Sequence, residues 1–155
     1  FKHKIFGLTI TSSWGNGHAT TYRALARALH ARGHDLVFFE RDLEWYASNR
    51  DMPEPPFCRV HMYEQWGDAQ SLLRRELAQA DVVVVGSYFP DGPTAIDEVL
   101  GSNVPVKAFY DIDTPITVAK LRAGDAEYIG RQLKGTSEQA VISAKAGNPP
   151  RSHAI

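Results

Sequence analysis

The stretch TITSSWGNGHATTYRAL, residues 9–25, decides how the rest of the chain is interpreted. An apolar run stops, a loop with two glycines and a histidine follows, and a run of helix-forming residues begins at once. This strand–loop–helix order is typical of the first unit of a parallel α/β domain, whose loops bind ligands. The stretch therefore predicts a binding loop, and the alternative is a tight turn in which His18 only caps or packs.

The same alternation continues on the carboxyl side of this loop. Five apolar runs rich in branched and aromatic residues are predicted as strands, at 4–11, 35–40, 58–63, 81–87 and 106–112. Helical patterns separate them, at 19–33, 68–80, 92–102 and 115–124, with a short helix after the second strand. This order predicts an α/β fold: a doubly wound, mainly parallel Rossmann-like sheet of order 3-2-1-4-5 with helices on both faces.

Length and composition narrow the classes of protein. A chain of 155 residues is expected to form one domain, here 1–133. Residues 134–155 are expected to form a short helix or strand followed by an exposed tail. The net charge of −1 provides no electrostatic footprint for nucleic acid, and no apolar run approaches the ~20 residues of a membrane span. A single cysteine favours a reducing, cytoplasmic setting. Association of the chain into a homo-oligomer stays open.

The glycine loop resembles a dinucleotide fingerprint in part. The segment GNGHAT, residues 15–20, matches G-x-G-x-x-G except that Thr20 replaces the last glycine. Glu40 ends the second predicted strand, where an acid that binds ribose is expected. Thr20 and the bulky Trp14 fit this pattern poorly, so a nicotinamide or flavin site of an oxidoreductase is one alternative interpretation. A non-catalytic Rossmann-like binding module is another.

A second interpretation uses the same physical features. Glycines let backbone N–H groups approach an anion or a hydroxyl-rich ligand, and the start of the helix adds partial positive charge. His18 then lies at the mouth of the cleft, where it can take a proton from a hydroxyl nucleophile.

Further candidate residues follow the fourth and fifth strands. Asp111 and Asp113 are two residues apart and share a face of the strand, so one of them can bind a sugar hydroxyl or orient His18. Capping of the next helix is the alternative for Asp113. Tyr88 can form an aromatic wall for a sugar ring, and Asp91 lies in the turn beside it. No spacing typical of metal ligands is found.

Three phrases together resemble the amino-terminal half of GT-B glycosyltransferases, and more narrowly the bacterial CgeB-like glycosyltransferase family: SSWGNGHATTYRALARALHARGHDLVFFERDLEWYASNRD, VVVVGSYFPDG and FYDIDTPITVAKL. The resemblance covers about residues 3–130. It implies two Rossmann-like domains facing a cleft, of which this chain is the acceptor side. A second domain, which does not follow here, would bind the nucleotide sugar, so the chain alone is expected to be inactive and to need no cofactor.

The resemblance also implies roles for the residues named above. Some GT-B enzymes use a histidine after the first strand as the base, and His18 is the matching position. The predicted catalytic residues are His18, Asp111 and Asp113. The predicted substrate-binding residues are Ser13, Trp14, Gly15, Asn16, Gly17, Thr20, Glu40, Tyr88 and Asp91. The expected partners are a sugar or other hydroxyl acceptor and, through the missing domain, a nucleotide sugar.

Overall fold

The computed structural model of the chain describes residues 1–125 and the backbone of residues 140–143. Its centre is one parallel sheet of order β3-β2-β1-β4-β5-β6. The strands are β1 (Lys2–Phe6), β2 (Asp35–Arg41), β3 (Arg59–Tyr63), β4 (Val82–Gly86), β5 (Val106–Asp111) and β6 (Ala140–Ser143). The helices are α1 (His18–His30), α2 (Glu44–Ala47), α3 (Trp66–Leu77), α4 (Gly92–Leu100) and α5 (Thr114–Arg122).

This arrangement confirms the predicted Rossmann-like α/β class and the strand order 3-2-1-4-5. β6 adds a sixth strand beside β5, in the segment 134–155 where the sequence predicted a short helix or strand before an exposed tail. The rest of that segment lies outside the described residues.

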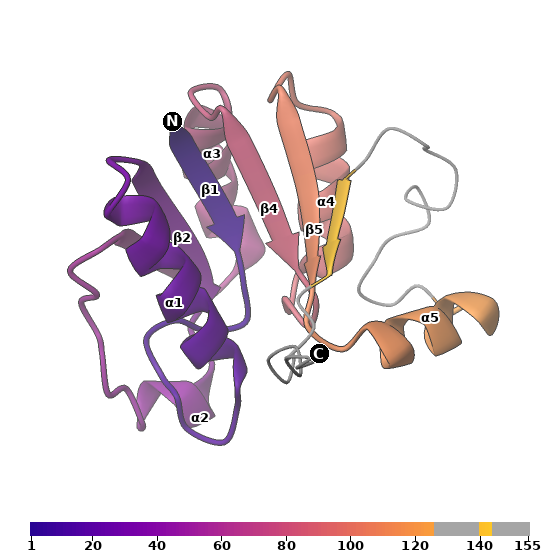
Figure 1. Ribbon diagram of the computed structural model, residues 1–155, viewed down its shortest axis with the longest axis horizontal. Helices are drawn as coiled ribbons and strands as arrows, with labels where there is room; N and C mark the ends of the chain where they lie inside the picture. Colours follow the sequence, from indigo (N-terminus) through magenta and orange to yellow (C-terminus); the bar gives the residue numbers. More distant parts are fainter. Residues whose placement is uncertain (126–139, 144–155) are drawn as a thin grey trace, which may run out of the picture.

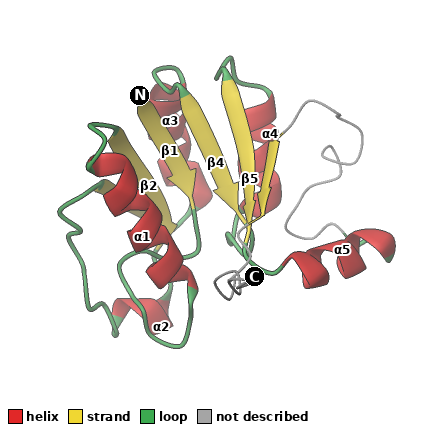
Figure 2. Cartoon of the chain, viewed as in Figure 1, coloured by secondary structure: helices red, strands yellow, loops and turns green. Residues whose placement is uncertain are grey.

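Helices cover both faces of the sheet (Figures 1 and 2): α1 lies on one face, and α3 and α4 lie on the other. The alternation along β2 explains this division, because successive side chains of a strand point to opposite faces. Leu36 and Phe38 pack in the cluster beneath α1, whereas Val37 and Phe39 pack in the cluster beneath α3 and α4. The continuous apolar runs therefore mark strands that are buried on both sides.

The first strand ends earlier than predicted, at Phe6 rather than at residue 11. Ile10 is fully buried, but it belongs to a loop under α1 and not to the sheet. The backbone N–H groups of Ile10 and Thr11 donate to a side chain, Glu40, instead of to a neighbouring strand. A buried loop and a buried strand have the same apolar composition, so the run alone could not separate them.

Two glycines let α1 approach the sheet where the strand order reverses. A Cβ atom on Gly86, at the end of β4, would lie 1.7 Å from the Tyr22 hydroxyl oxygen. A Cβ atom on Gly7, just after β1, would lie 2.4 Å from the Phe38 ring and 2.7 Å from the Tyr22 ring. The Tyr22 ring of α1 therefore fills the space that the two glycines leave at the ends of β1 and β4.

Candidate functional site

The candidate site lies at the carboxyl edge of the sheet, where the loops after β1, β4 and β5 meet. The strands are parallel, so the segments that follow them all leave from this edge. The strand order reverses between β1 and β4, and ligands of open α/β sheets bind beside such a reversal. Figure 1 shows α1, α2 and the start of α5 around this edge, with α5 projecting away from the sheet.

Glu40, the last buried residue of β2, holds the loop after β1. Its side chain is 0% exposed. One carboxylate oxygen accepts hydrogen bonds from the N–H groups of Ile10 (2.8 Å) and Thr11 (3.1 Å). The other oxygen accepts from the hydroxyls of Thr9 (2.9 Å) and Thr11 (2.6 Å). With all four bonds made inside the fold, Glu40 anchors the loop rather than presenting a carboxylate to a ligand, contrary to its predicted role.

A second anchor joins the loop to the segment after α2. Arg23 of α1 is buried, and its guanidinium binds both carboxylate oxygens of Asp51, at 2.9 and 2.8 Å. The same guanidinium donates from Nε to the Ile10 carbonyl at 2.8 Å. Asp51 also accepts from the N–H and the hydroxyl of Ser13, both at 2.9 Å. The bond from Arg23, followed by those from Ser13, holds the pKa of the Asp51 carboxyl well below its usual range.

Ser13, a predicted substrate-binding residue, lies in this loop, and its N–H and hydroxyl both donate to Asp51. Neither Arg23 nor Asp51 was singled out from the sequence. Arg23 lies next to Tyr22 on the buried side of α1, which marks it as a charge needing a partner. Sequence spacing contains no signal that this partner is Asp51, 28 residues away.

His18 is the first residue of α1 and is half-buried. The Tyr88 ring meets its imidazole edge-on, with centroids 5.4 Å apart and planes at 86°. Within the described residues, its buried Nδ1 atom has no hydrogen-bond partner. Burial lowers the pKa of His18, and the charge of Asp113 opposes that effect. Burial thus favours the neutral imidazole, which is the form that accepts a proton.

The two predicted aspartates have separate positions. Asp111 is 1% exposed, and its Oδ1 accepts from the Asp113 N–H at 3.2 Å and from the Thr117 hydroxyl at 2.9 Å. It therefore holds the first turn of α5. Asp113 is partly exposed and is the carboxylate whose charge acts on His18. Of the pair, Asp113 is the carboxylate that acts on the pKa of His18.

Asp91 precedes α4 and ties together the ends of two other strands. Its carboxylate accepts from the Tyr63 hydroxyl at 2.7 Å and pairs with Arg41 at 3.3 Å. Asp42 pairs instead with Arg50, whose Nε also donates to the Thr11 hydroxyl at 3.2 Å. Asp91 thus joins the ends of β2 and β3 beside the candidate site. A ligand that binds Asp91, as predicted, would have to compete with these two bonds.

The glycine segment of the loop is open to solvent. Trp14 is 53% exposed, and Gly15 has a φ of +63°, which explains a glycine at that turn. Gly17 precedes α1, and a Cβ atom there would meet nothing within 4 Å. Asn16 accepts from the Ala19 N–H at 3.2 Å, which caps α1. Thr20 faces solvent on the first turn of α1, so close packing against the sheet falls to Tyr22 and not to residue 20.

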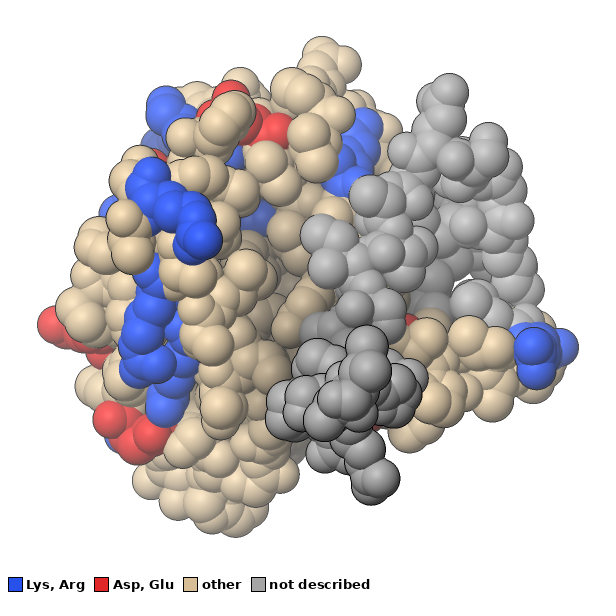
Figure 3. All heavy atoms as spheres, in the orientation of Figure 1, with Lys and Arg blue, Asp and Glu red and all other residues tan. Residues whose placement is uncertain are grey.

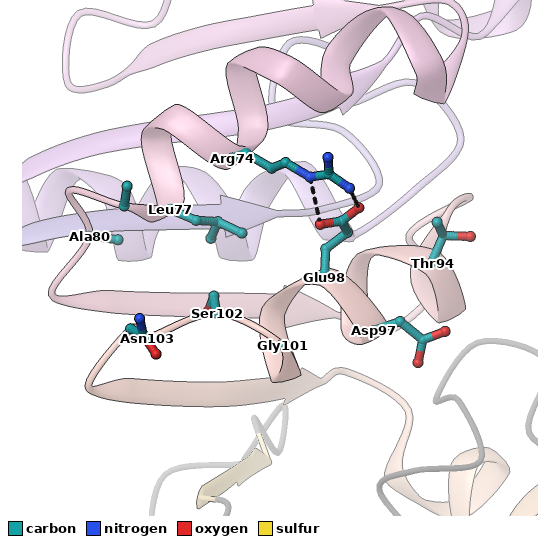
Figure 4. Close-up of a pocket in the computed structure, with 10 residues that line it drawn as sticks. Arg74, Leu77, Ala80, Thr94, Asp97, Glu98, Gly101, Ser102 and Asn103 are labelled. Carbon is teal, nitrogen blue, oxygen red and sulfur yellow. Dashed lines mark hydrogen bonds and ion pairs between the residues drawn. The ribbon is translucent and has the colours of Figure 1, made fainter.

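A groove of about 590 Å³ lies elsewhere, between α3 and α4 (Figure 4). Arg74 and Glu98 form an ion pair across it at 2.9 Å, and the residues after both helices line its other end. Those residues lead into β4 and β5, so the groove reaches the amino edge of the sheet, opposite the candidate site.

Basic side chains gather over the part of the surface that α1 covers (Figure 3). Two basic side chains of α1 are engaged within the fold: Arg23 binds Asp51, and Arg27 lies over the Phe57 ring at 4.9 Å. Within residues 1–125 and 140–143, no helix combines the length and apolar character needed to cross a bilayer, and no three histidine, cysteine or acidic side chains cluster as metal ligands.

No family model, curated protein or solved structure matches this chain. The assignment of a function therefore depends on the arrangement of His18, Tyr88 and Asp113 at the carboxyl edge.

Proposed function

We propose that this chain is the acceptor-side half of a glycosyltransferase, in which His18 is the general base. The observation that carries the proposal is a half-buried imidazole at the strand-order reversal, held against Tyr88 and within the field of the Asp113 carboxylate. These groups come from the segments that follow three different strands, β1, β4 and β5, as in catalytic sites whose residues come from the ends of several strands. The sequence resemblance to GT-B glycosyltransferases supports the same assignment.

In the proposed reaction, an acceptor hydroxyl attacks the anomeric carbon of a nucleotide sugar. The new glycosidic bond forms while the bond from that carbon to the nucleotide's phosphate oxygen breaks. His18 takes the hydroxyl proton, and the nucleotide leaves with the electron pair of the broken bond. Asp113 stabilises the imidazolium that results, because its charge favours the protonated form of His18.

The acceptor would lie over the loop after β1. The exposed Trp14 ring offers an apolar face to a sugar ring, and the loop beneath it is held by Glu40 and Asp51. A preorganised loop of this kind supports catalysis because the acceptor loses less entropy when it is oriented. The nucleotide sugar would be bound by a second domain across the cleft.

The dinucleotide alternative loses its main support in the structure. Binding of a ribose needs a free carboxylate at the end of β2, and Glu40 already accepts four hydrogen bonds without any exposed surface. We therefore do not propose an oxidoreductase.

The proposal is tested on the purified chain by ¹⁵N NMR titration with glucose, galactose and N-acetylglucosamine. We expect at least one sugar to shift the signals of residues 13–18 and 113, and His18→Gln to weaken this binding. The matched control is His30→Gln, at the exposed far end of the same helix, which should bind as the unmodified chain does.

Absence of binding by all three sugars would contradict the proposal, and so would either of two further results. Titration with NADH that gives micromolar binding at the same residues would favour the dinucleotide interpretation. Rapid sugar transfer from UDP-glucose or GDP-mannose by the chain alone would show that the acceptor-side assignment is wrong, because no second domain would then be needed.

A further inference from the structure

Tyr88 has an unusual backbone. Its φ is +63°, and among residues 1–125 and 140–143 it is the one residue other than glycine with a positive φ. The left-handed region is unfavourable for a side chain with a Cβ atom, and for a bulky ring it is a marked outlier. Such strain persists where the surroundings determine it and is found at functional sites. The position therefore needs a physical explanation.

The neighbours of Tyr88 impose this conformation from both sides. Ser87 is buried, its N–H donates to the Tyr110 carbonyl at 2.8 Å, and its hydroxyl accepts from the Ile112 N–H at 3.1 Å. Phe89 is buried in the cluster beneath α3 and α4, with its ring centroid 5.7 Å from that of Phe6. The chain must turn sharply between these two anchors, and residue 88 takes up the turn.

The turn aims the Tyr88 ring at His18. The two rings meet edge-on at 5.4 Å, while Tyr22 lies 6.5 Å from the imidazole at 36°. Burial raises the pKa of the Tyr22 hydroxyl, so the Tyr22 ring carries no charge near pH 7. Within the described residues, the charged group that acts on the imidazole is Asp113, just before α5. The Tyr88 and Tyr22 rings thus flank His18, and the Asp113 carboxylate acts on its charge.

We propose that Tyr88 is a positioning residue for His18, and that its strained backbone is the means by which its ring is set against the imidazole. The ring fixes the orientation of His18 and keeps water from that edge. This inference rests on the proposed function only in assuming that His18 must be a neutral base. The contact itself can be tested without any substrate.

A glycine at position 88 separates the two explanations. Glycine adopts a positive φ without strain, so Tyr88→Gly should keep the turn and remove the ring alone. If the ring served only the fold, this replacement would destabilise the domain. If the ring serves His18, the domain should melt at or above the temperature of the unmodified chain, and the pKa of His18 should change.

The experiment follows the histidine side chains by NMR as the pH is varied, in the unmodified chain and in Tyr88→Gly and Tyr88→Phe. In Tyr88→Gly the pKa of His18 should rise toward about 6.5, the value of an exposed histidine, because water reaches the ring. In Tyr88→Phe the pKa of His18 should stay unchanged, because the phenyl edge remains. His3 and His61 lie away from this loop and serve as controls in the same spectra, so their pKa values should be the same in all three chains.

Two outcomes would overturn the inference. One is a folded Tyr88→Gly chain in which the pKa of His18 is unchanged. The other is a Tyr88→Gly chain that unfolds, since the ring would then support the fold rather than His18. A rise in the pKa of His18 together with no binding of any sugar would leave the positioning role intact and remove the proposed function.

Discussion

Replacing Glu40 by alanine should release the loop after β1. The carboxylate accepts four hydrogen bonds, two from backbone N–H groups and two from threonine hydroxyls. The hydroxyls can rotate toward other acceptors, and Thr9 already lies 3.5 Å from the Ser12 carbonyl. The N–H groups of Ile10 and Thr11 have no such freedom, because both are fixed in the buried backbone.

These two N–H groups determine the expected magnitude. A buried donor left without a partner costs about 1–3 kcal/mol, so Glu40→Ala should lower the free energy of unfolding by about 2–6 kcal/mol. That is a large part of the ~5–15 kcal/mol that stabilises an ordinary domain. Glu40→Gln keeps one oxygen for the two N–H groups and should lose only about 1–2 kcal/mol, because the bonds are no longer charge-assisted.

The assay is urea unfolding followed by circular dichroism, with m compared between variants to confirm that the same surface unfolds. Glu54→Ala is the control, since that side chain is exposed, and its free energy of unfolding should change by less than about 0.5 kcal/mol. A loss below about 1 kcal/mol in Glu40→Ala would refute the reasoning. The loop would then not depend on Glu40, and its carboxylate would again be a candidate for binding a ligand.

Three further predictions concern the same edge of the sheet. The folded chain lowers the pKa of Asp51, so the stability that this group contributes is present above about pH 4 and is lost as the pH falls. In Asp51→Asn, the melting temperature should therefore depend less on pH in this acidic range. Asp113→Asn should lower the pKa of His18 in an NMR titration, since the carboxylate raises it, and a rise would contradict the arrangement. Gly86→Ala should lower the free energy of unfolding in urea by about 1–3 kcal/mol, because the new Cβ atom would overlap the Tyr22 hydroxyl. Adding Tyr22→Phe should recover part of that loss.

Charge partners were the least predictable part of the site. Arg41 and Asp42 are neighbours in sequence, and the simplest expectation is that they pair with each other. In the structure, Arg41 binds Asp91 and Asp42 binds Arg50. Adjacent residues of an extended chain point in opposite directions, so each finds its partner on a different element.

The predicted site residues were brought together only in part. The rings of His18 and Tyr88 meet, and the charge of Asp113 acts on His18, although these residues follow three different strands. They come together because the segments that follow parallel strands all leave from one edge of the sheet. Asp111 and Asp91 reach the same edge, but their oxygens are used to hold α5 and to join β2 to β3. Residue type and position after a strand do not reveal whether a carboxylate is already bonded.

The sequence by itself determined the class of fold and the order of the strands. Continuous apolar runs that alternate with amphipathic helices can bury both faces of a sheet in few ways, and right-handed crossovers leave few strand orders. It also placed a glycine loop and a histidine at the carboxyl edge. Tertiary structure decided what each polar group there does, because this depends on contacts between distant segments. Glu40 shows the difference: its place at the end of β2 was predictable, but the loop that folds back onto it takes up every oxygen it has.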